Sequence, residues 1–233
     1  WSNQDQPRAL SRFGTTDERY RVQCAKMLGT ILHNLHGTPF IYQGEEIGMV
    51  NVPWTSVNQL RDVEILNFVN DCRNTGAPED FMWQAIWRKA RDNARVPMPW
   101  DGSKNGGFTT GEPWIMLNPD YKEINVASAM ADPDSVYWYY RRLIELRKHN
   151  LIMPYGEFKL LWPEDETLFA FEKHLDGEHW LIVGNFSDKE ITVTLPAEYK
   201  NCDTVISTMK ACGLSDGGLT LGAWEAEVIS FEL

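Results

Sequence analysis

The first eight residues contain the polar side chains whose types could take part in chemistry. Their sequence is Trp-Ser-Asn-Gln-Asp-Gln-Pro-Arg, which places the carboxylate of Asp5 near the amide of Gln4 and the guanidinium of Arg8. An ionised carboxylate accepts hydrogen bonds, and amides and guanidinium groups donate them. A loop at the mouth of a binding site has this composition, and so has a solvated chain end. The residue types alone leave both interpretations open.

The composition is that of an ordinary globular protein. The chain has 233 residues, of which 43% are hydrophobic and 24% are charged, so it is long enough for one large or two modest domains. No apolar run approaches the roughly 20 residues of a membrane-spanning helix, and no secretory signal opens the sequence. Because the chain begins with Trp rather than Met, we expect a processed product or a fragment.

The charge and the cysteines narrow the possible partners. A net charge of −11 disfavours nucleic acid and anionic membranes and is compatible with neutral substrates such as sugars. The four cysteines, Cys24, Cys72, Cys202 and Cys212, have no CxxC spacing and no metal-binding pattern. We therefore expect no metal and no cofactor, and free thiols in a reducing cytoplasm. A disulfide between Cys202 and Cys212 is the alternative.

The first fifty residues alternate in the manner of an α/β barrel. Residues 15–18, Thr-Thr-Asp-Glu, have the pattern of a capping box, and apolar residues then recur at helical spacing over residues 20–35. A short apolar strand is predicted at residues 38–42, followed by a polar, glycine-rich loop at residues 43–49. In α/β barrels the chemistry lies just beyond the carboxyl ends of such strands.

Residues 50–130 depart from that alternation. Helices are predicted at residues 60–70 and 79–89, and a third is predicted to start with Asp132 as N-cap and Pro133 in its first turn. Between them lies a segment rich in Pro and Gly, residues 97–114. We expect three large aromatic side chains to hold this segment in place: Trp100, Phe108 and Trp114.

From residue 156 onward the hydrophobic period changes to two, which predicts an antiparallel β domain. The predicted strands cover residues 157–161, 167–173, 179–186, 190–195, 204–209 and 225–231. The sequence therefore predicts two domains, residues 1–152 and residues 153–233.

Several motifs in the same order resemble glycoside hydrolase family 13, the α-amylase superfamily, and within it the oligo-1,6-glucosidase and α-glucosidase branch. Residues 3–8, Asn-Gln-Asp-Gln-Pro-Arg, are similar to the Asn-His-Asp-Gln-Pro-Arg motif that closes strand seven of the family's barrel. Gln4 stands where the family has His. Further similar stretches are residues 37–49 (GTPFIYQGEEIGM), 90–101 (ARDNARVPMPWD), 107–111 (GFTTG) and 132–136 (DPDSV).

The resemblance implies a fold and indicates which part of it carries the catalytic carboxylates. The family fold is a (β/α)8 barrel followed by an antiparallel β-sandwich domain, and this chain corresponds to strands seven and eight, the following helices and the β domain. The family's nucleophilic Asp and general-acid Glu belong to earlier strands. Retaining glycosidases need these two carboxylates about 5 Å apart. We therefore expect residues 1–233 alone to be inactive, with the N-terminal barrel portion as their partner.

The resemblance also assigns roles to single residues. It implies that Asp5 is the third carboxylate, which hydrogen-bonds ring hydroxyls more tightly in the transition state. Gln4 can still donate to a sugar hydroxyl but cannot carry positive charge. Arg91 matches an arginine that closes the pocket around the nonreducing-end glucose. Arg8 and Arg95 are weaker candidates, for the pocket rim or for structural ion pairs.

Each assignment has a structural alternative: Asp5 is otherwise a surface carboxylate, and Arg91 an exposed residue at a helix end. Glu45 and Glu46 resemble an acid/base pair, but in the family they follow strand eight and are structural. The expected function is the C-terminal portion of a retaining exo-α-glucosidase acting on neutral oligosaccharides, with α-1,6 linkages preferred. The alternatives are a trehalose-6-phosphate hydrolase and, because of Gln4 and the missing carboxylates, a non-catalytic sugar-binding or interaction protein.

Overall fold

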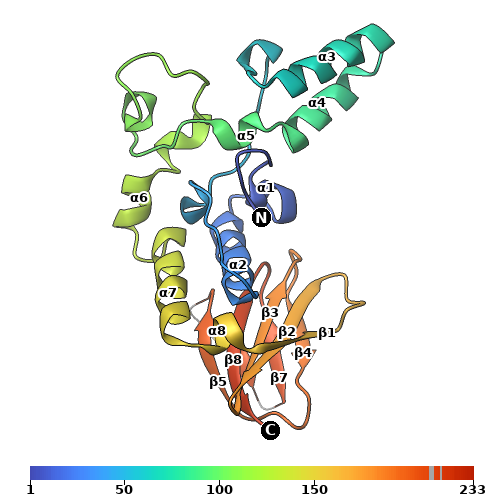
Figure 1. The fold of residues 1–233 in the computed structure, drawn as a ribbon, viewed down its shortest axis with the longest axis vertical. Coiled ribbons are helices and arrows are strands. Elements are labelled where there is room, and N and C mark those ends of the chain that lie inside the picture. Colours follow the sequence, from blue (N-terminus) through green and yellow to red (C-terminus); the bar gives the residue numbers. More distant parts are fainter. Residues whose placement is uncertain (210–212, 216) are drawn as a thin grey trace. The chain divides into compact units, whose positions relative to one another are not determined.

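A computed structural model describes residues 1–209, 213–215 and 217–233. The chain forms two compact units (Figure 1). Unit 1 comprises residues 1–16 and 41–137, and unit 2 comprises residues 17–40 and 138–233. The predicted domain division between residues 152 and 153 stays a prediction. The contacts divide the chain elsewhere because helix α2 (Arg21–Asn34) packs on the five-stranded β-sheet of unit 2.

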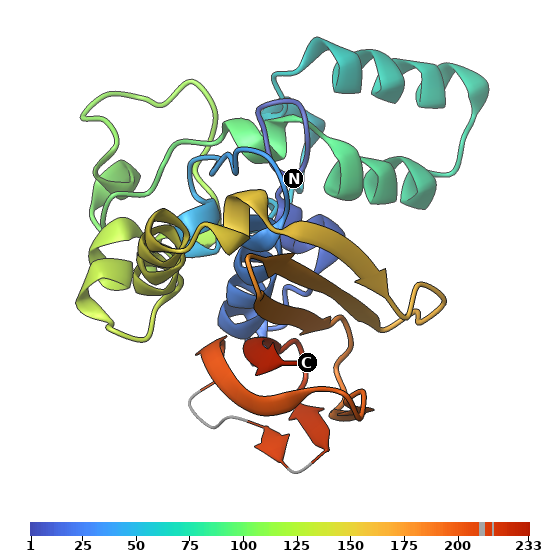
Figure 2. The ribbon, with the colours of Figure 1, turned by 60° about the horizontal axis from the view of Figure 1, so that its bottom comes forward.

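Unit 1 is built from short helices and turns, and residues 1–16 and 41–137, all of them described, contain no strand. The helices predicted at residues 60–70 and 79–89 are confirmed as α3 and α4, which lie side by side (Figures 1 and 2). Asp62 caps α3 by accepting from the Glu64 N–H at 3.2 Å. The elements are α1 (Ala9–Phe13), α3 (Val63–Thr75), α4 (Glu79–Lys89), α5 (Asp92–Arg95), α6 (Val126–Ala131) and the 3-10 turns η1 (Glu45–Ile47), η2 (Val57–Gln59), η3 (Lys104–Gly107) and η4 (Pro119–Lys122).

The strand predicted at residues 38–42 is wrong. These residues form neither helix nor strand, and the Phe40 side chain is 78% exposed. A strand satisfies its backbone N–H and C=O groups by pairing with a neighbouring strand. No described strand of this chain pairs with residues 38–42, so an apolar sequence alone does not make this segment a strand.

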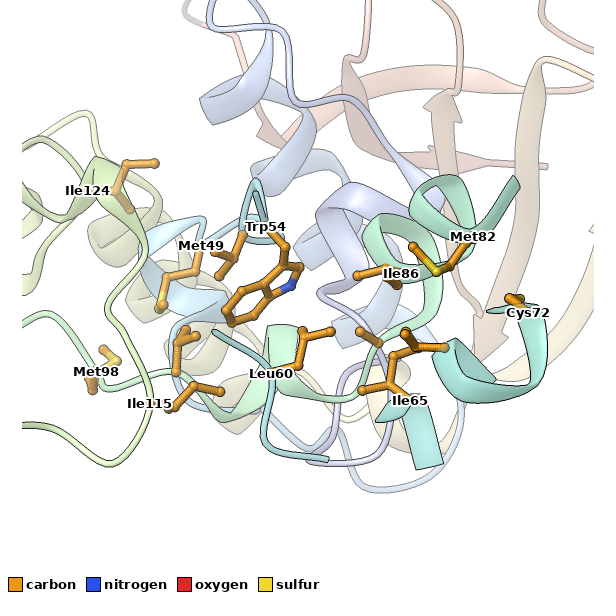
Figure 3. Close-up of a cluster of buried hydrophobic side chains, with 14 of the residues drawn as sticks. Met49, Trp54, Leu60, Ile65, Cys72, Met82, Ile86, Met98, Ile115 and Ile124 are labelled. Atoms are coloured by element: carbon orange, nitrogen blue, oxygen red, sulfur yellow. The ribbon is translucent and has the colours of Figure 1, made fainter. Parts of the chain in front are cut away.

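The core of unit 1 surrounds Trp54. Figure 3 shows its fully buried ring among Met49, Leu60 and Ile115. The indole N–H donates to the Asn93 side-chain oxygen at 2.9 Å. This hydrogen bond satisfies the only polar atom of the buried tryptophan side chain. The core therefore joins segments from the whole length of residues 41–137.

The segment at residues 97–114 is ordered by its backbone, and the prediction that three aromatic side chains hold it is wrong. Trp100, Phe108 and Trp114 are each at least half exposed. Instead the Trp100 N–H donates to the carbonyl oxygen of Gly106 at 2.7 Å, and the Trp100 carbonyl accepts from the Ala127 N–H at 2.9 Å. Gly106 has a φ of 61°, which favours glycine.

Unit 2 contains a five-stranded antiparallel sheet in the order β1-β2-β3-β8-β5 and a three-stranded sheet in the order β4-β7-β6. The predicted strands are all present; β5 begins earlier than predicted, and the short strands β6 and β7 were not predicted. The strands are β1 (Glu157–Leu161), β2 (Leu168–Leu175), β3 (Glu178–Asn185), β4 (Ile191–Thr194), β5 (Lys200–Ser207), β6 (Leu214–Ser215), β7 (Gly218–Leu221) and β8 (Ala226–Glu232).

The central strands of the five-stranded sheet, β3 and β8, are buried on both faces. Leu181 and Ile229 pack in a cluster with Leu219 of the smaller sheet. Their neighbours along the strands, such as Ile182, pack in a second cluster with Ile31 of α2 and with α8 (Ile152–Tyr155). Successive side chains of a strand point to opposite faces. The sheet therefore forms the middle layer of unit 2, with helices on one side and the three-stranded sheet on the other.

Helix α2 also packs closely against α7 (Val136–His149). A Cβ atom at Gly29 would lie 2.6 Å from the Tyr140 ring, so only glycine fits this mid-helix position. Beside it, the hydroxyls of Thr30 and Tyr139 are 2.7 Å apart. The Arg147 guanidinium donates to carbonyl oxygens just past the end of α2, including Leu35 at 3.3 Å. Such cations satisfy acceptors that a helix end leaves open.

The helix starts predicted from the capping box at residues 15–18 and from Asp132 are each about one turn too early. Helix α2 begins at Arg21, after a turn in which the Asp17 carbonyl accepts from the Arg21 N–H at 2.8 Å. Helix α7 begins at Val136, and Asp132 closes a turn before it by accepting from the Ser135 N–H at 3.0 Å. Short polar side chains favour turns as readily as helix caps.

Cys72 is a buried free thiol and Cys202 a partly buried one, and Cys24 is buried. Cys212 lies outside the described residues, and so does the alternative pairing with Cys202. Within the described part of the chain, no helix is long and apolar enough to cross a membrane.

We predict that Lys173→Met stabilises the fold more at neutral than at alkaline pH. The Lys173 side chain is fully buried on β2, where it donates to the Met153 carbonyl, and burial lowers its pKa to about 8. Because this value lies below the ordinary 10.5, the charged side chain destabilises the folded state fully below about pH 8, and the effect disappears above about pH 10.5.

The increase in the free energy of unfolding caused by Lys173→Met should be larger at pH 7 than at pH 10, by on the order of 2 kcal/mol. Urea unfolding followed by circular dichroism at the two pH values measures this difference. Lys189→Met, at an exposed lysine of the same unit, is the control. An equal difference at both pH values for Lys173→Met would contradict the assignment of a buried, destabilising ammonium group.

Candidate functional site

Asp5, Arg91 and Arg95 come together in unit 1, although residues 5 and 91 are far apart in sequence. The Asp5 Oδ1 atom lies 2.8 Å from Arg95 Nη2 and 3.8 Å from Arg91 Nη1. The Asp5 side chain remains 52% exposed. A carboxylate held by two guanidinium groups and open to solvent can accept hydrogen bonds from a ligand while its own orientation stays fixed.

The loop that carries Asp5 is held by its neighbours. The Asp5 N–H donates to the Asn3 side-chain oxygen at 2.8 Å, which forms a local turn. The Arg95 Nε–H donates to the Gln4 carbonyl oxygen at 3.0 Å. Arg95 therefore binds both the backbone of the loop and the carboxylate of Asp5, while the exposed position of Gln4 leaves its side chain on the surface.

Arg91 is fixed by a carboxylate that the sequence did not single out. Arg91 donates from Nε and Nη2 to the two oxygens of Asp62, both at 2.7 Å, in a bidentate pair. The Asp62 side chain is only 4% exposed, and the hydrogen bond from Arg91 lowers the pKa of Asp62. Glu64 lies 3.1 Å from Arg91 Nη2 on the exposed side. Asp62 and Glu64 thus belong to the site.

Asp92 links this pair to the backbone. Its Oδ2 atom accepts from the N–H groups of Arg61, at 2.7 Å, and Asp62, at 3.0 Å. The start of α3 is thereby tied to the start of α5. The only hint in the sequence was that an Asp precedes α3 as its N-cap; nothing in the sequence spacing connects Asp62 with Arg91.

Arg8 is buried among backbone carbonyl groups of unit 1. Its guanidinium is 2% exposed and donates to the carbonyl oxygens of Gln43 at 2.5 Å, Asn93 at 3.2 Å and Ala94 at 3.4 Å. A ligand has no access to these atoms. Arg8 therefore joins three segments of unit 1, which favours the structural candidate role over a place at the pocket rim.

The loop at residues 43–49 packs around Arg8. Gly44 has a φ of 93°, and a Cβ there would lie 2.3 Å from Met49 Sδ and 3.0 Å from Arg8 Nη1, so this position requires glycine. Glu46 accepts from the Gly44 N–H at 2.8 Å, and burial raises the pKa of Glu46. These contacts agree with a structural role for Glu46. Among the described residues, no cluster of His, Cys, Asp or Glu side chains could hold a metal ion.

The chain is similar to known glycoside hydrolases over most or all of its length. The chain is 48% identical over 198 residues to an oligo-1,6-glucosidase of Halalkalibacterium halodurans, which covers 85% of this chain and 35% of that protein. It is 43% identical over 235 residues to an oligo-1,6-glucosidase of Bacillus cereus, covering 100% and 42%. The crystal structure of trehalose-6-phosphate hydrolase from Bacillus licheniformis superposes with a TM-score of 0.94 at 39% identity, again covering 100% of this chain and 42% of the other.

The chain thus spans 35–42% of the length of these relatives. Residues 168–228 match the C-terminal domain described for the α-amylase SusG, which agrees with the predicted β-sandwich. Residues 1–156 match the family described as alpha amylase, catalytic domain, and the chain belongs to this family.

Proposed function

We propose that this chain is the C-terminal portion of a retaining exo-α-glucosidase of the oligo-1,6-glucosidase type, acting on short neutral oligosaccharides. The observation that carries the proposal is the exposed carboxylate of Asp5, oriented by Arg95 and Arg91 within the motif that resembles the family's strand-seven end. The relatives named oligo-1,6-glucosidase support the same branch. The free thiol of Cys72 supports a reducing, cytoplasmic compartment.

In this proposal Asp5 binds hydroxyl groups of the terminal glucose. As the ring flattens toward an oxocarbenium ion, hydrogen bonds from these hydroxyls to the carboxylate strengthen, so the contact lowers the barrier rather than merely tightening binding. Arg91 offers a planar set of donors beside Asp5, and its pairing with Asp62 holds that set in one orientation. The resemblance assigns the nucleophile and the general acid to strands that precede the matched motifs.

Gln4 is the departure from the family pattern. An amide donates a hydrogen bond to a hydroxyl as a neutral group, whereas a histidine can also carry a proton and a positive charge. We propose that Gln4 is an uncharged contact to the same glucose as Asp5.

Two other functions have some support. The Bacillus licheniformis structure carries the name trehalose-6-phosphate hydrolase, so a phosphorylated disaccharide is a second candidate substrate. A non-catalytic sugar-binding protein is favoured by Gln4 alone.

We predict that the protein carrying a complete barrel hydrolyses isomaltose with a higher kcat/KM than trehalose 6-phosphate, as measured by glucose release. Preference for trehalose 6-phosphate, or binding of sugar without turnover, would select one of the other two functions.

We predict that Asp5→Asn in the protein with a complete barrel lowers kcat much more than it raises KM. A lost charge-assisted contact of about 1.5–3 kcal/mol corresponds to a fall of roughly 10-fold to 150-fold. Steady-state kinetics on isomaltose measure the effect. Asp80→Asn, at an exposed carboxylate of α4, is the matched control and should leave both constants unchanged. Retention of more than about a tenth of wild-type kcat would remove Asp5 from the reacting centre.

We predict that Gln4→His keeps or raises kcat/KM for isomaltose, because it restores the side chain found in the family's motif. Gln4→Ala, which removes the hydrogen-bonding group altogether, should lower kcat/KM and serves as the comparison. A clear loss of activity in Gln4→His would show that the site is adapted to an amide, which would favour altered specificity over the proposed function.

A further inference from the structure

Two carboxylates and two guanidinium groups of unit 1 form a closed ring in which the charges alternate. Arg91 lies 2.7 Å from Asp62 and 3.8 Å from Asp5. Arg95 lies 2.8 Å from Asp5 and 3.6 Å from Asp62. Each guanidinium therefore lies between the two carboxylates, and each carboxylate contacts both guanidinium groups. We call these four side chains the charge ring.

The charge ring has one buried corner and one open corner. The Asp62 side chain is 4% exposed, whereas that of Asp5 is 52% exposed. Arg91 donates to both Asp62 oxygens, and one of these oxygens also caps α3 by accepting from the Glu64 N–H. A ligand therefore has access to the ring at Asp5 and not at Asp62. Any effect of Asp62 on a ligand must act through the two arginines.

The buried carboxylate sets the net charge that a ligand meets at Asp5. The hydrogen bond from Arg91 lowers the pKa of Asp62, so this group is ionised at neutral pH and the ring carries two positive and two negative charges. If Asp62 were neutral, two guanidinium groups would face the single carboxylate of Asp5, and the ring would be positive overall. Glu64 also contacts Arg91, but its side chain is 74% exposed, so water screens its charge more strongly.

This charge balance affects the reaction proposed above. The transition state of glycoside hydrolysis resembles an oxocarbenium ion, so positive charge develops on a sugar ring that is neutral in the bound substrate. A charge ring with a net positive charge would raise the energy of the transition state and leave that of the bound substrate nearly unchanged. The cost therefore falls on the rate rather than on substrate binding.

We propose that Asp62 is a positioning residue for the reaction: it holds the two arginines together around Asp5 and offsets one of their positive charges, so that Asp5 can stabilise a cationic sugar ring. The inference rests on the proposed function and extends it to a residue that a substrate cannot reach. Two guanidinium groups beside one carboxylate repel each other, and a second carboxylate between them offsets that repulsion. The bidentate pair with Arg91 and the contact with Arg95 place Asp62 in that position.

The test compares a cationic and a neutral ligand in the protein with a complete barrel. The probes are 1-deoxynojirimycin, an iminosugar used at a pH at which its ring nitrogen is protonated, and glucose, both titrated by calorimetry. Asp62→Asn removes the charge but keeps an acceptor for Arg91 and a residue suited to the N-cap. It should weaken iminosugar binding about tenfold and glucose binding by less than about threefold. For isomaltose, kcat should fall more than KM rises.

Two further variants separate the effect of charge from a structural effect. Asp71→Asn removes an exposed carboxylate of the same helix and should change neither affinity. Arg95→Gln removes one positive charge, so the ratio of iminosugar affinity to glucose affinity should rise. Combined with Asp62→Asn, it should return this ratio to within about threefold of the wild-type value. Both affinities should still fall in the double variant, because Arg95 also binds the Gln4 carbonyl oxygen.

An unchanged affinity ratio in Asp62→Asn and Arg95→Gln, with isomaltose still hydrolysed, would overturn the role of Asp62 and leave the α-glucosidase proposal intact. If no α-glucoside is hydrolysed but the ratio shifts as expected, the proposed function fails, whereas the effect of Asp62 on a cationic sugar is supported. Wild-type protein that binds neither probe would overturn both. Should circular dichroism show that Asp62→Asn does not fold, the ratio in Arg95→Gln alone decides.

Discussion

The bidentate ion pair between Arg91 and Asp62 is the interaction on which the arrangement of the site depends. One guanidinium joins the cap of α3 to the start of α5 and still reaches toward Asp5. Asp62 is almost completely buried, so breaking the pair would leave a buried charge with only the weaker contact to Arg95 at 3.6 Å, which costs more than the loss of a surface ion pair. This asymmetry keeps Arg91 in one rotamer. The exposed carboxylate of Asp5 therefore meets a donor set that is already oriented before a ligand arrives.

Sequence reasoning succeeded where local pattern alone decides the structure. The bounds of α4 and β1 agree with the predicted ranges because each segment has clear breaks on both sides. The proximity of Asp5 and Arg91 followed from a motif resemblance, not from spacing. The partner of Arg91 could not be found in the same way, since Asp62 looks like any other N-cap residue until the fold brings it opposite the guanidinium.

The errors have a common physical origin in tertiary context. Residues 38–42 have the composition of a buried strand, but a strand exists only when another strand pairs with it. Trp100, Phe108 and Trp114 are large enough to hold a loop in place, yet backbone hydrogen bonds order that loop and leave the rings half exposed. For Arg8 the sequence left the pocket rim and a structural role open, because nothing in the sequence indicates that three carbonyl groups surround it. In each case the deciding contact comes from a distant part of the chain.

The packing of α2 on the five-stranded sheet also bears on how the chain is made. Helix α2 ends at Asn34, whereas the strands that bury its apolar face begin only at Leu168. A ribosome synthesises the chain from its N-terminus, so this face stays exposed while all of residues 41–137 emerge. Contacts of such high sequence separation form slowly because a long loop must close first. Unit 2 can therefore complete its fold only after synthesis has reached β8.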